Sequence, residues 1–195
     1  RSHWLYALAG SYGTVEPFGN WYEAGQYACV TAYPATYYHL VSWIGDTDGG
    51  FEEGNLLTLP MTRPRNVVAK FAANRTATHL VPEPWLASYG WTNDFEAAAE
   101  GDGDGDGMAT WKEWYSDTDP TNACSLLALR GLALTNGTAE LAWIGGTAKT
   151  QIVQQSLSPD GPWQGIFTNL PPTPVTNTLA FPPEQTSGFF RIAIP

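Results

Sequence analysis

Hydrophobic and polar residues alternate with a period of two over most of the chain. Such alternation places successive side chains on opposite faces of a strand, so each run predicts a half-buried β-strand. The runs in the first part are Trp4–Leu8, Gly25–Pro34, Tyr38–Trp43, Asn55–Leu59 and Asn66–Phe71. Those in the last part are Leu126–Leu129, Leu132–Leu134, Ala139–Trp143, Gln151–Ser156, Trp163–Ile166, Asn177–Phe181 and Phe189–Ile194.

The stretch between these two β regions has a helical pattern instead. Short helices are predicted at Pro84–Gly90, Asn93–Glu100 and Thr110–Tyr115, the first ended by its glycine and the second capped by Asn93 or Asp94. We therefore expect a mainly β protein with two small β domains joined by a short helical module. The expected boundaries are residues 1–73, 74–124 and 125–195.

The helical module contains an acidic stretch with the spacing of an EF-hand loop, which binds Ca²⁺ through oxygens at positions 1, 3, 5, 7, 9 and 12. These positions are Asp102, Asp104, Asp106, the carbonyl of Met108, Thr110 and Glu113. Gly107 occupies position 6, where the loop turns sharply. A solvated acidic linker is the alternative, but linkers do not require a closing glutamate. The spacing predicts a calcium site.

A second cation site is predicted less specifically beside the first. Asp117 and Asp119 follow the third helix, and Asp94 or Glu96 would complete the set. An Asp-Pro turn at Asp119-Pro120 explains the same residues without a metal, so both readings stay open.

The middle stretch resembles the dockerin-like and thrombospondin type 3-like calcium modules of large secreted or surface proteins of bacteria. The residues that carry the resemblance are Trp85–Gly90, Asn93–Phe95, the Asp-Gly run, Trp111–Trp114 and Thr118–Asn122. The resemblance implies a structural calcium spacer of EF-hand-like type, as opposed to a calcium-triggered sensor.

The first segment resembles the internalin-type B-repeat, a small β-grasp-like module of bacterial surface proteins. The resemblance rests on Gly13–Val15, Tyr22–Gly25, Val30–Pro34, Trp43–Asp46 with Met61, and Val67–Phe71. The chain departs from the family pattern at Tyr37 and in the acidic loop Asp48–Glu53. The resemblance implies a stalk or adhesion unit without a catalytic motif.

The last segment resembles, more loosely, the fibronectin type III-like C-terminal modules of bacterial surface proteins. The carriers are Leu141–Trp143, Val153–Ser156, Pro162-Trp163 and Phe190–Ile192. The resemblance implies a β-sandwich.

Composition narrows the function classes. The formal net charge is −10 over 195 residues, and the few basic residues are scattered, which argues against nucleic-acid binding. No apolar run is long enough to span a membrane, and neither a Gly-x-Ser-x-Gly elbow nor a phosphate-binding glycine loop is present. We expect a non-catalytic, secreted or cell-surface protein; the absence of a signal peptide before Arg1 fits a chain processed on export.

Two cysteines, Cys29 and Cys124, are far apart in sequence and have no metal-ligand spacing. Outside the cell we expect them to form a disulfide, with two buried free thiols as the alternative. Asn74 and Asn136 each begin an Asn-x-Thr sequon and are possible glycosylation sites.

We expect a calcium-stabilised structural protein that forms a surface filament or the stalk or tail of a modular surface protein. The apolar terminal segments His3–Leu8 and Phe189–Ile194 predict self-association into a homopolymer by strand pairing. The alternative is a carbohydrate-binding or adhesion accessory module that holds surface glycans on exposed Trp side chains. Against it, Trp43, Trp143 and Trp163 are expected in the cores of their domains.

Overall fold

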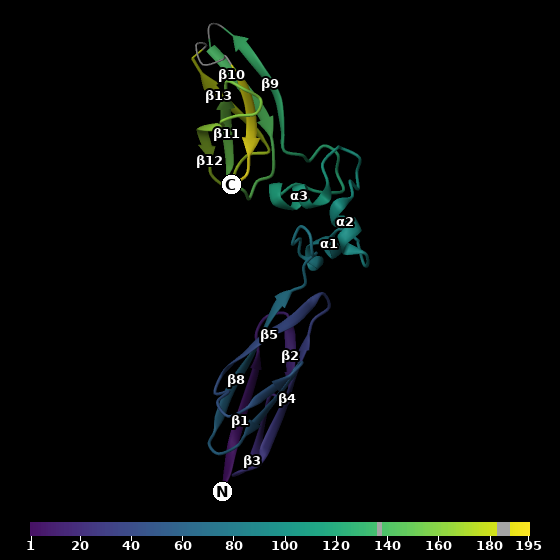
Figure 1. Ribbon diagram of the computed structural model, residues 1–195, viewed down its shortest axis with the longest axis vertical. Helices are drawn as coiled ribbons and strands as arrows, with labels where there is room; N and C mark the ends of the chain where they lie inside the picture. Colours follow the sequence, from purple (N-terminus) through teal and green to yellow (C-terminus); the bar gives the residue numbers. More distant parts are fainter. Residues whose placement is uncertain (136–137, 183–187) are drawn as a thin grey trace. The chain divides into compact units, whose positions relative to one another are not determined.

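The computed structural model describes residues 1–135, 138–182 and 188–195 (Figure 1). By their contacts the residues fall into two compact units, Arg1–Ser88 and Tyr89–Pro195. Both units are built mainly of antiparallel strands, as the alternating patterns predicted. The division into three domains remains a prediction.

The first unit contains two four-stranded sheets. One has the order β3-β1-β8-β5 and the other β2-β4-β7-β6. Their strands are β1 (Ser2–Ala9), β2 (Gly13–Glu16), β3 (Gly19–Glu23), β4 (Tyr27–Pro34), β5 (Tyr38–Gly45), β6 (Phe51–Glu53), β7 (Leu56–Pro60) and β8 (Arg65–Ala73). Neighbours pair antiparallel except β1 and β8, which run parallel with Leu5 opposite Arg65 and Ala9 opposite Ala69.

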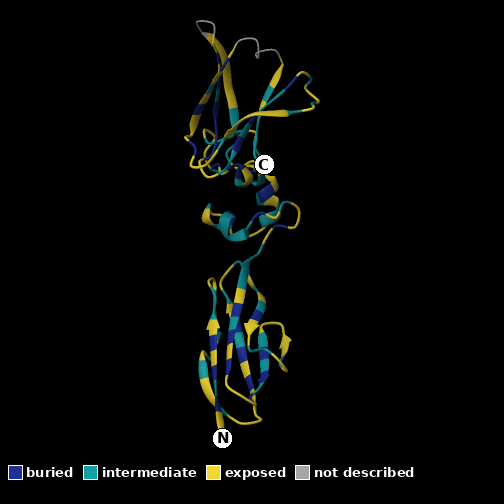
Figure 2. Ribbon diagram, turned by 90° about the vertical axis from the view of Figure 1, so that its left-hand side faces the viewer, coloured by how far each residue is buried: buried dark blue, intermediate teal, exposed yellow. Residues whose placement is uncertain are grey.

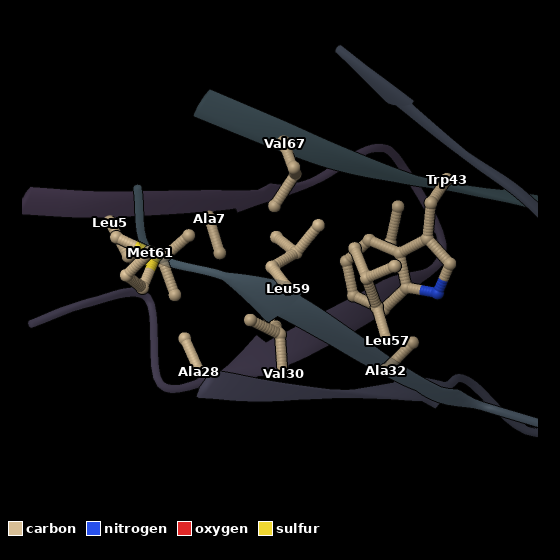
Figure 3. Packing of buried hydrophobic residues seen from close by; sticks show 11 residues of the cluster. Leu5, Ala7, Ala28, Val30, Ala32, Trp43, Leu57, Leu59, Met61 and Val67 are labelled. Carbon is tan, nitrogen blue, oxygen red and sulfur yellow. The ribbon is translucent and has the colours of Figure 1, made fainter. Parts of the chain in front are cut away.

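The core of the first unit is formed by the inward-facing residues of both sheets (Figure 3). Alternate residues of β4 are buried, and the residues between them are exposed or half-buried. Figure 2 shows the same alternation of buried and exposed positions along strands of the first unit. The buried members are Leu5, Ala7, Ala28, Val30, Ala32, Trp43, Leu57, Leu59, Met61, Val67 and Ala69. Strand period therefore accounts for much of this core, whereas Met61 enters it from outside the strands.

The acidic loop that departs from the B-repeat pattern is held by two arginines. Arg65 is 2 % exposed, and its guanidinium donates to Asp48 at 2.7 Å and to the carbonyl of Pro60 at 3.1 Å. Arg63 bridges Asp46 at 2.8 Å and Asp48 at 2.5 Å. The backbone N–H of Asn66 and the Arg63 guanidinium lower the pKa of the Asp46 carboxyl. Asp48 of this loop and the preceding Asp46 thus have structural partners.

Helix α1 (Glu83–Ser88) belongs to the first unit, and two further short helices begin the second. These are α2 (Phe95–Glu100) and α3 (Thr110–Ser116), close to the predicted ranges. Gly90, after α1, has φ of +101°, which confirms it as the helix-ending glycine. Asp94 precedes α2 but forms no capping hydrogen bond through its side chain.

The rest of the second unit contains two three-stranded sheets, β13-β10-β9 and β12-β11-β14. The strands are β9 (Ala128–Thr135), β10 (Thr138–Ile144), β11 (Gln151–Ser156), β12 (Gln164–Asn169), β13 (Thr176–Phe181) and β14 (Phe189–Ala193). Their common core is Ala139, Leu141, Trp143, Val153 and Phe181. We refer to β9–β14 as the C-terminal sandwich.

Three details differ from the sequence expectation. Leu126–Leu129 and Leu132–Leu134 were expected as separate strands, but Ala128–Thr135 forms one strand whose register shifts opposite Ala142/Trp143. A β-bulge of this kind interrupts alternation without ending a strand. Strands β3 and β6 were not expected, because Gly19–Glu23 is irregular in polarity and Phe51–Glu53 is exposed throughout.

No helix among the described residues is long and apolar enough to cross a membrane.

Candidate metal centre

The acidic loop folds so that its three aspartates converge. Ligand oxygens of Asp102, Asp104 and Asp106 all lie within 4.8 Å of one another. Gly105 has φ of +77° and Gly107 of +92°, a left-handed conformation that glycine adopts without strain. The Asp-Gly alternation therefore serves two purposes, since the aspartates supply oxygens and the glycines allow the backbone to curl around them.

Backbone amides inside the loop fix the carboxylates in place. Asp102 accepts from the N–H of Gly105 at 2.8 Å and of Gly107 at 2.9 Å. Asp106 accepts from the N–H of Met108 at 2.7 Å. These bonds lower the pKa of the Asp102 carboxyl, with the Gly107 amide as the largest cause, and keep this carboxylate charged.

Helix α3 follows the loop and carries two further buried oxygen ligands, although the carboxylate of Glu113 lies outside the group in which the three aspartates converge. Thr110 and Glu113 each have 0 % exposure. The Thr110 N–H donates to the carbonyl of Gly101 at 2.8 Å, which closes the loop across its base. The carbonyl of Glu113 accepts from the N–H of Thr118 at 3.0 Å. These two bonds fix the backbone at the start and near the end of α3.

Five buried side-chain oxygens around this loop have no hydrogen-bond donor among the described residues. They are Asp104 Oδ2, Asp106 Oδ2, Thr110 Oγ1 and both carboxylate oxygens of Glu113. Buried polar atoms without a partner are rare because each costs about 1–3 kcal/mol, and more when charged. All five belong to residues whose spacing predicted calcium ligation. A hard divalent cation is the partner that satisfies carboxylate and hydroxyl oxygens together.

The pKa of Glu113 shows that a charged carboxylate is unfavourable at this position in the metal-free loop. Burial raises the pKa of its carboxyl to about 8, and the negative charges of Asp104, Asp106, Asp102 and Asp119 act in the same direction. The metal-free protein therefore holds a proton at Glu113 that a free glutamate releases near its ordinary value of 4.5. A cation at this position would replace the proton.

This shift predicts an unusual pH dependence for the metal-free protein. Between pH 4.5 and about 8 the folded state holds a proton that the unfolded state has lost, so the free energy of unfolding falls as pH rises. Below this window the contribution is complete, and above it the contribution is lost. Urea unfolding in chelator across this range measures it, with Glu113→Gln as the variant that lacks the titrating group. A stability that is flat or rises over the window contradicts the burial of this carboxyl.

The predicted second cation site is not assembled in the structure. Among the described residues, side chains that could hold a metal converge only at Asp102, Asp104 and Asp106, so Asp94, Asp117 and Asp119 form no such group. Asp119 accepts from Thr121 Oγ1 at 2.7 Å in a local turn. Asp117 accepts instead from backbone amides of the C-terminal sandwich. The alternative explanation, a turn at Asp119-Pro120, therefore accounts for Asp119 without a metal.

The expected Cys29–Cys124 disulfide is not present, since both thiols are free and exposed. Cys29 faces out of the first unit, as the alternation of β4 predicted, and its Sγ lies 3.8 Å from Thr58 Oγ1. Cys124 lies in a loop of the other unit, where its N–H donates to Asn122 Oδ1 at 3.1 Å. The two cysteines thus lie in different units.

The sequons remain predictions. Asn74 is half-buried with its Oδ1 at 2.9 Å from His39 Nδ1, and Thr76 of the same sequon is buried and accepts from the N–H of Val81. Asn136 lies outside the described residues.

Two of the three tryptophans expected in the domain cores are buried there. Trp43 and Trp143 lie in the cores, which confirms two of the three predicted core positions. Trp163 is half-buried instead, with the guanidinium of Arg191 over its ring at 4.3 Å from the ring centre. Trp21 is 63 % exposed and contacts Trp4 edge-on at 5.3 Å.

Comparison with known proteins identifies one part of the chain. Residues 5–75 match the family model of the divergent InlB B-repeat domain. Searches of curated proteins and of solved structures give no match. The family is a non-enzymatic module typical of bacterial surface proteins. The first unit therefore contains a B-repeat-type module of the kind used on bacterial surfaces.

Proposed function

We propose that this chain is a non-catalytic, extracellular structural protein in which calcium stabilises the second unit. It would serve as a subunit of a surface filament or as the stalk or tail of a modular surface protein. The single observation that carries the calcium assignment is the set of five buried, unpartnered oxygens on four residues with EF-hand spacing.

The chemistry of the site favours calcium over other common cations. The oxygens that converge or lack a partner here are carboxylate and hydroxyl oxygens, and such oxygen ligands suit hard cations. Calcium tolerates the irregular, six- to eight-fold coordination that a loop with a closing glutamate provides. Magnesium requires near-octahedral geometry and retains its waters, so the same loop suits it less well.

A surface role is supported by the B-repeat module and by a partly uncovered sandwich. On β9, Leu132 pairs with Leu141 and Leu134 with Ala139, so these leucines project on the same face as the core residues of β10. Yet Leu132 and Leu134 are exposed. An uncovered stretch of inner face beside a sheet edge favours association with another strand.

The strand order limits which terminal segment could pair with a strand of another copy. Strand β1 lies between β3, which pairs with Ser2 to Tyr6, and β8, which pairs with Leu5 to Ala9, so little of the terminal segment His3–Leu8 is left unpaired. Strand β14 pairs only with β11 among the described strands. Of the two terminal segments predicted to self-associate, Phe189–Ile194 would therefore offer the more open edge.

Carbohydrate binding is the second candidate, and one observation favours it. The exposed Trp21, in edge contact with Trp4, offers an aromatic face of the kind that stacks on sugars. Single exposed aromatics also occur on ordinary protein surfaces, so this observation is weaker than the buried oxygens of the loop.

The test is calorimetric titration of Ca²⁺ into the chelator-treated full chain. We expect one site with a Kd of roughly 10⁻⁶ to 10⁻⁴ M and much weaker binding of Mg²⁺. Asp104→Asn removes a central carboxylate and should weaken binding at least tenfold, whereas Asp160→Asn, the same change at an exposed turn of the same unit, should not. Absence of Ca²⁺ binding, or equal loss in the two variants, contradicts the proposal.

A further inference from the structure

The C-terminal end of α3 is joined to the C-terminal sandwich by a carboxylate. Asp117 directly follows α3, and its Oδ2 accepts from the backbone N–H of Thr147 at 3.0 Å and of Ala148 at 2.7 Å. Both amides belong to the loop between β10 and β11. One side chain thus satisfies two adjacent backbone donors of another element.

Gly146 allows the helix end and this loop to come into direct contact. A Cβ at this position would overlap with the carbonyl oxygens of Ser116 and Asp117. Any side chain here would force the two segments apart. Backbone therefore packs on backbone at this junction, and a shift of one segment displaces the other.

The same loop is bonded to the core of the sandwich. The Gly146 carbonyl accepts from Gln151 Nε2 at 2.7 Å and from Thr173 Oγ1 at 2.8 Å. Gln151 is fully buried, and its Oε1 accepts from the indole N–H of Trp143 at 2.7 Å. Trp143 belongs to the sandwich core. Buried networks of this kind lose much of their stabilisation when one member moves.

At its other end α3 carries the candidate metal ligands. Thr110 is its first residue, and Glu113 precedes Asp117 by about one turn. The helix has only seven residues, too few to be stable in isolation, so its position depends on what holds its two ends. The metal loop holds the first end and the Asp117 contacts hold the second.

We propose that calcium binding at the loop and the stability of the C-terminal sandwich are coupled through α3, with Asp117 as the positioning residue. The inference rests on the proposed calcium function and adds that the ion strengthens strands β10 and β11, which contribute no ligand. Coupling of this kind is reciprocal, so loss of the Asp117 contacts must weaken calcium binding by the same factor.

The test is hydrogen exchange of the full chain, followed by mass spectrometry, in Ca²⁺ and in chelator. We expect amides of β10 and β11 to exchange about tenfold more slowly with Ca²⁺, within the usual range of coupling between sites. Strands of the first unit serve as the internal reference and should not change. Calorimetry on the same samples reports whether Ca²⁺ binds.

Asp117→Gly removes the carboxylate without straining the backbone, since Asp117 has φ of +57°. We expect it to abolish the protection of β10 and β11 and to weaken Ca²⁺ binding about tenfold. Asp94→Gly is the matched control, with φ of +47° at Asp94 and no side-chain cap bond. Asp117→Asn keeps an acceptor oxygen and should fold and retain most of the coupling.

The outcomes separate the inference from the function on which it rests. Absence of Ca²⁺ binding in the wild type overturns both. Ca²⁺ binding without slower exchange in β10 and β11 overturns the coupling alone. Equal protection in the wild type, Asp117→Asn and Asp117→Gly overturns the role of Asp117, as does equal loss in Asp117→Gly and Asp94→Gly.

Discussion

Glu113→Gln is expected to have opposite effects with and without calcium. In calcium at 100 times the Kd, the wild-type second unit should gain about 2.7 kcal/mol in its free energy of unfolding. The variant lacks the closing carboxylate and should bind Ca²⁺ at least about 100-fold more weakly, since even residues behind the ligands contribute 10–100-fold to metal affinity. The gain should therefore fall to about 0.4 kcal/mol or less.

In chelator the order should reverse, with the variant more stable than the wild type above pH 8. Glutamine removes a buried charge that is repelled by Asp104 and Asp106. Its amide N–H groups also offer donors to the unpartnered Oδ2 atoms of both aspartates. The order of stability would thus depend on whether the ion is bound.

Urea unfolding of both proteins, in Ca²⁺ and in chelator, measures this reversal. Glu140→Gln makes the same chemical change at an exposed position of β10 and should shift neither condition. A Glu113→Gln protein that keeps its calcium gain, or that is less stable than the wild type in chelator, contradicts the assignment of Glu113.

Leu57→Ala is expected to destabilise the first unit by about 2–5 kcal/mol, the usual cost of a Leu→Ala cavity in a packed core. Leu57 is fully buried on β7 between the two sheets (Figure 3). This loss is a large part of the 5–15 kcal/mol by which domains are typically stable.

The matched control is Leu8→Ala, because Leu8 on β1 faces outward and is 43 % exposed. It should cost well below about 1 kcal/mol. Thermal unfolding of the full chain reports the first unit, and calorimetry with Ca²⁺ reports the second. Loss of calcium affinity in Leu57→Ala would show that the two units do not fold independently.

The first unit was largely predictable because its strands alternate regularly. Val30 and its neighbours on β4 follow the period of two without interruption, so their burial could be read from the sequence. Strand β9 was not, because a bulge breaks the alternation, and Leu132 and Leu134 are exposed although they project on the same face as the core residues of β10. Alternation reports a regular strand, but it does not report whether another element covers its face.

The calcium loop was predictable because ligand chemistry imposes a local spacing. Asp102 to Glu113 lie within one loop and one helical turn, so no long-range information was needed. The role of Asp117 was not predictable in this way. Its partners, Thr147 and Ala148, lie 30 and 31 residues further along the chain, and nothing in the sequence links an acid after a helix to two backbone amides. The expected disulfide failed for the same reason, since sequence separation carries no geometry.

The parallel pairing of β1 with β8 determines how the first unit would respond to tension. These are the first and last strands of the module, and they lie side by side in the same direction from Leu5–Arg65 to Ala9–Ala69. Pulling the start of β1 away from the end of β8 loads their ladder of hydrogen bonds in shear, all at once, whereas antiparallel terminal strands would unzip one bond at a time. A module connected in this way resists extension at the point where the chain enters and leaves it.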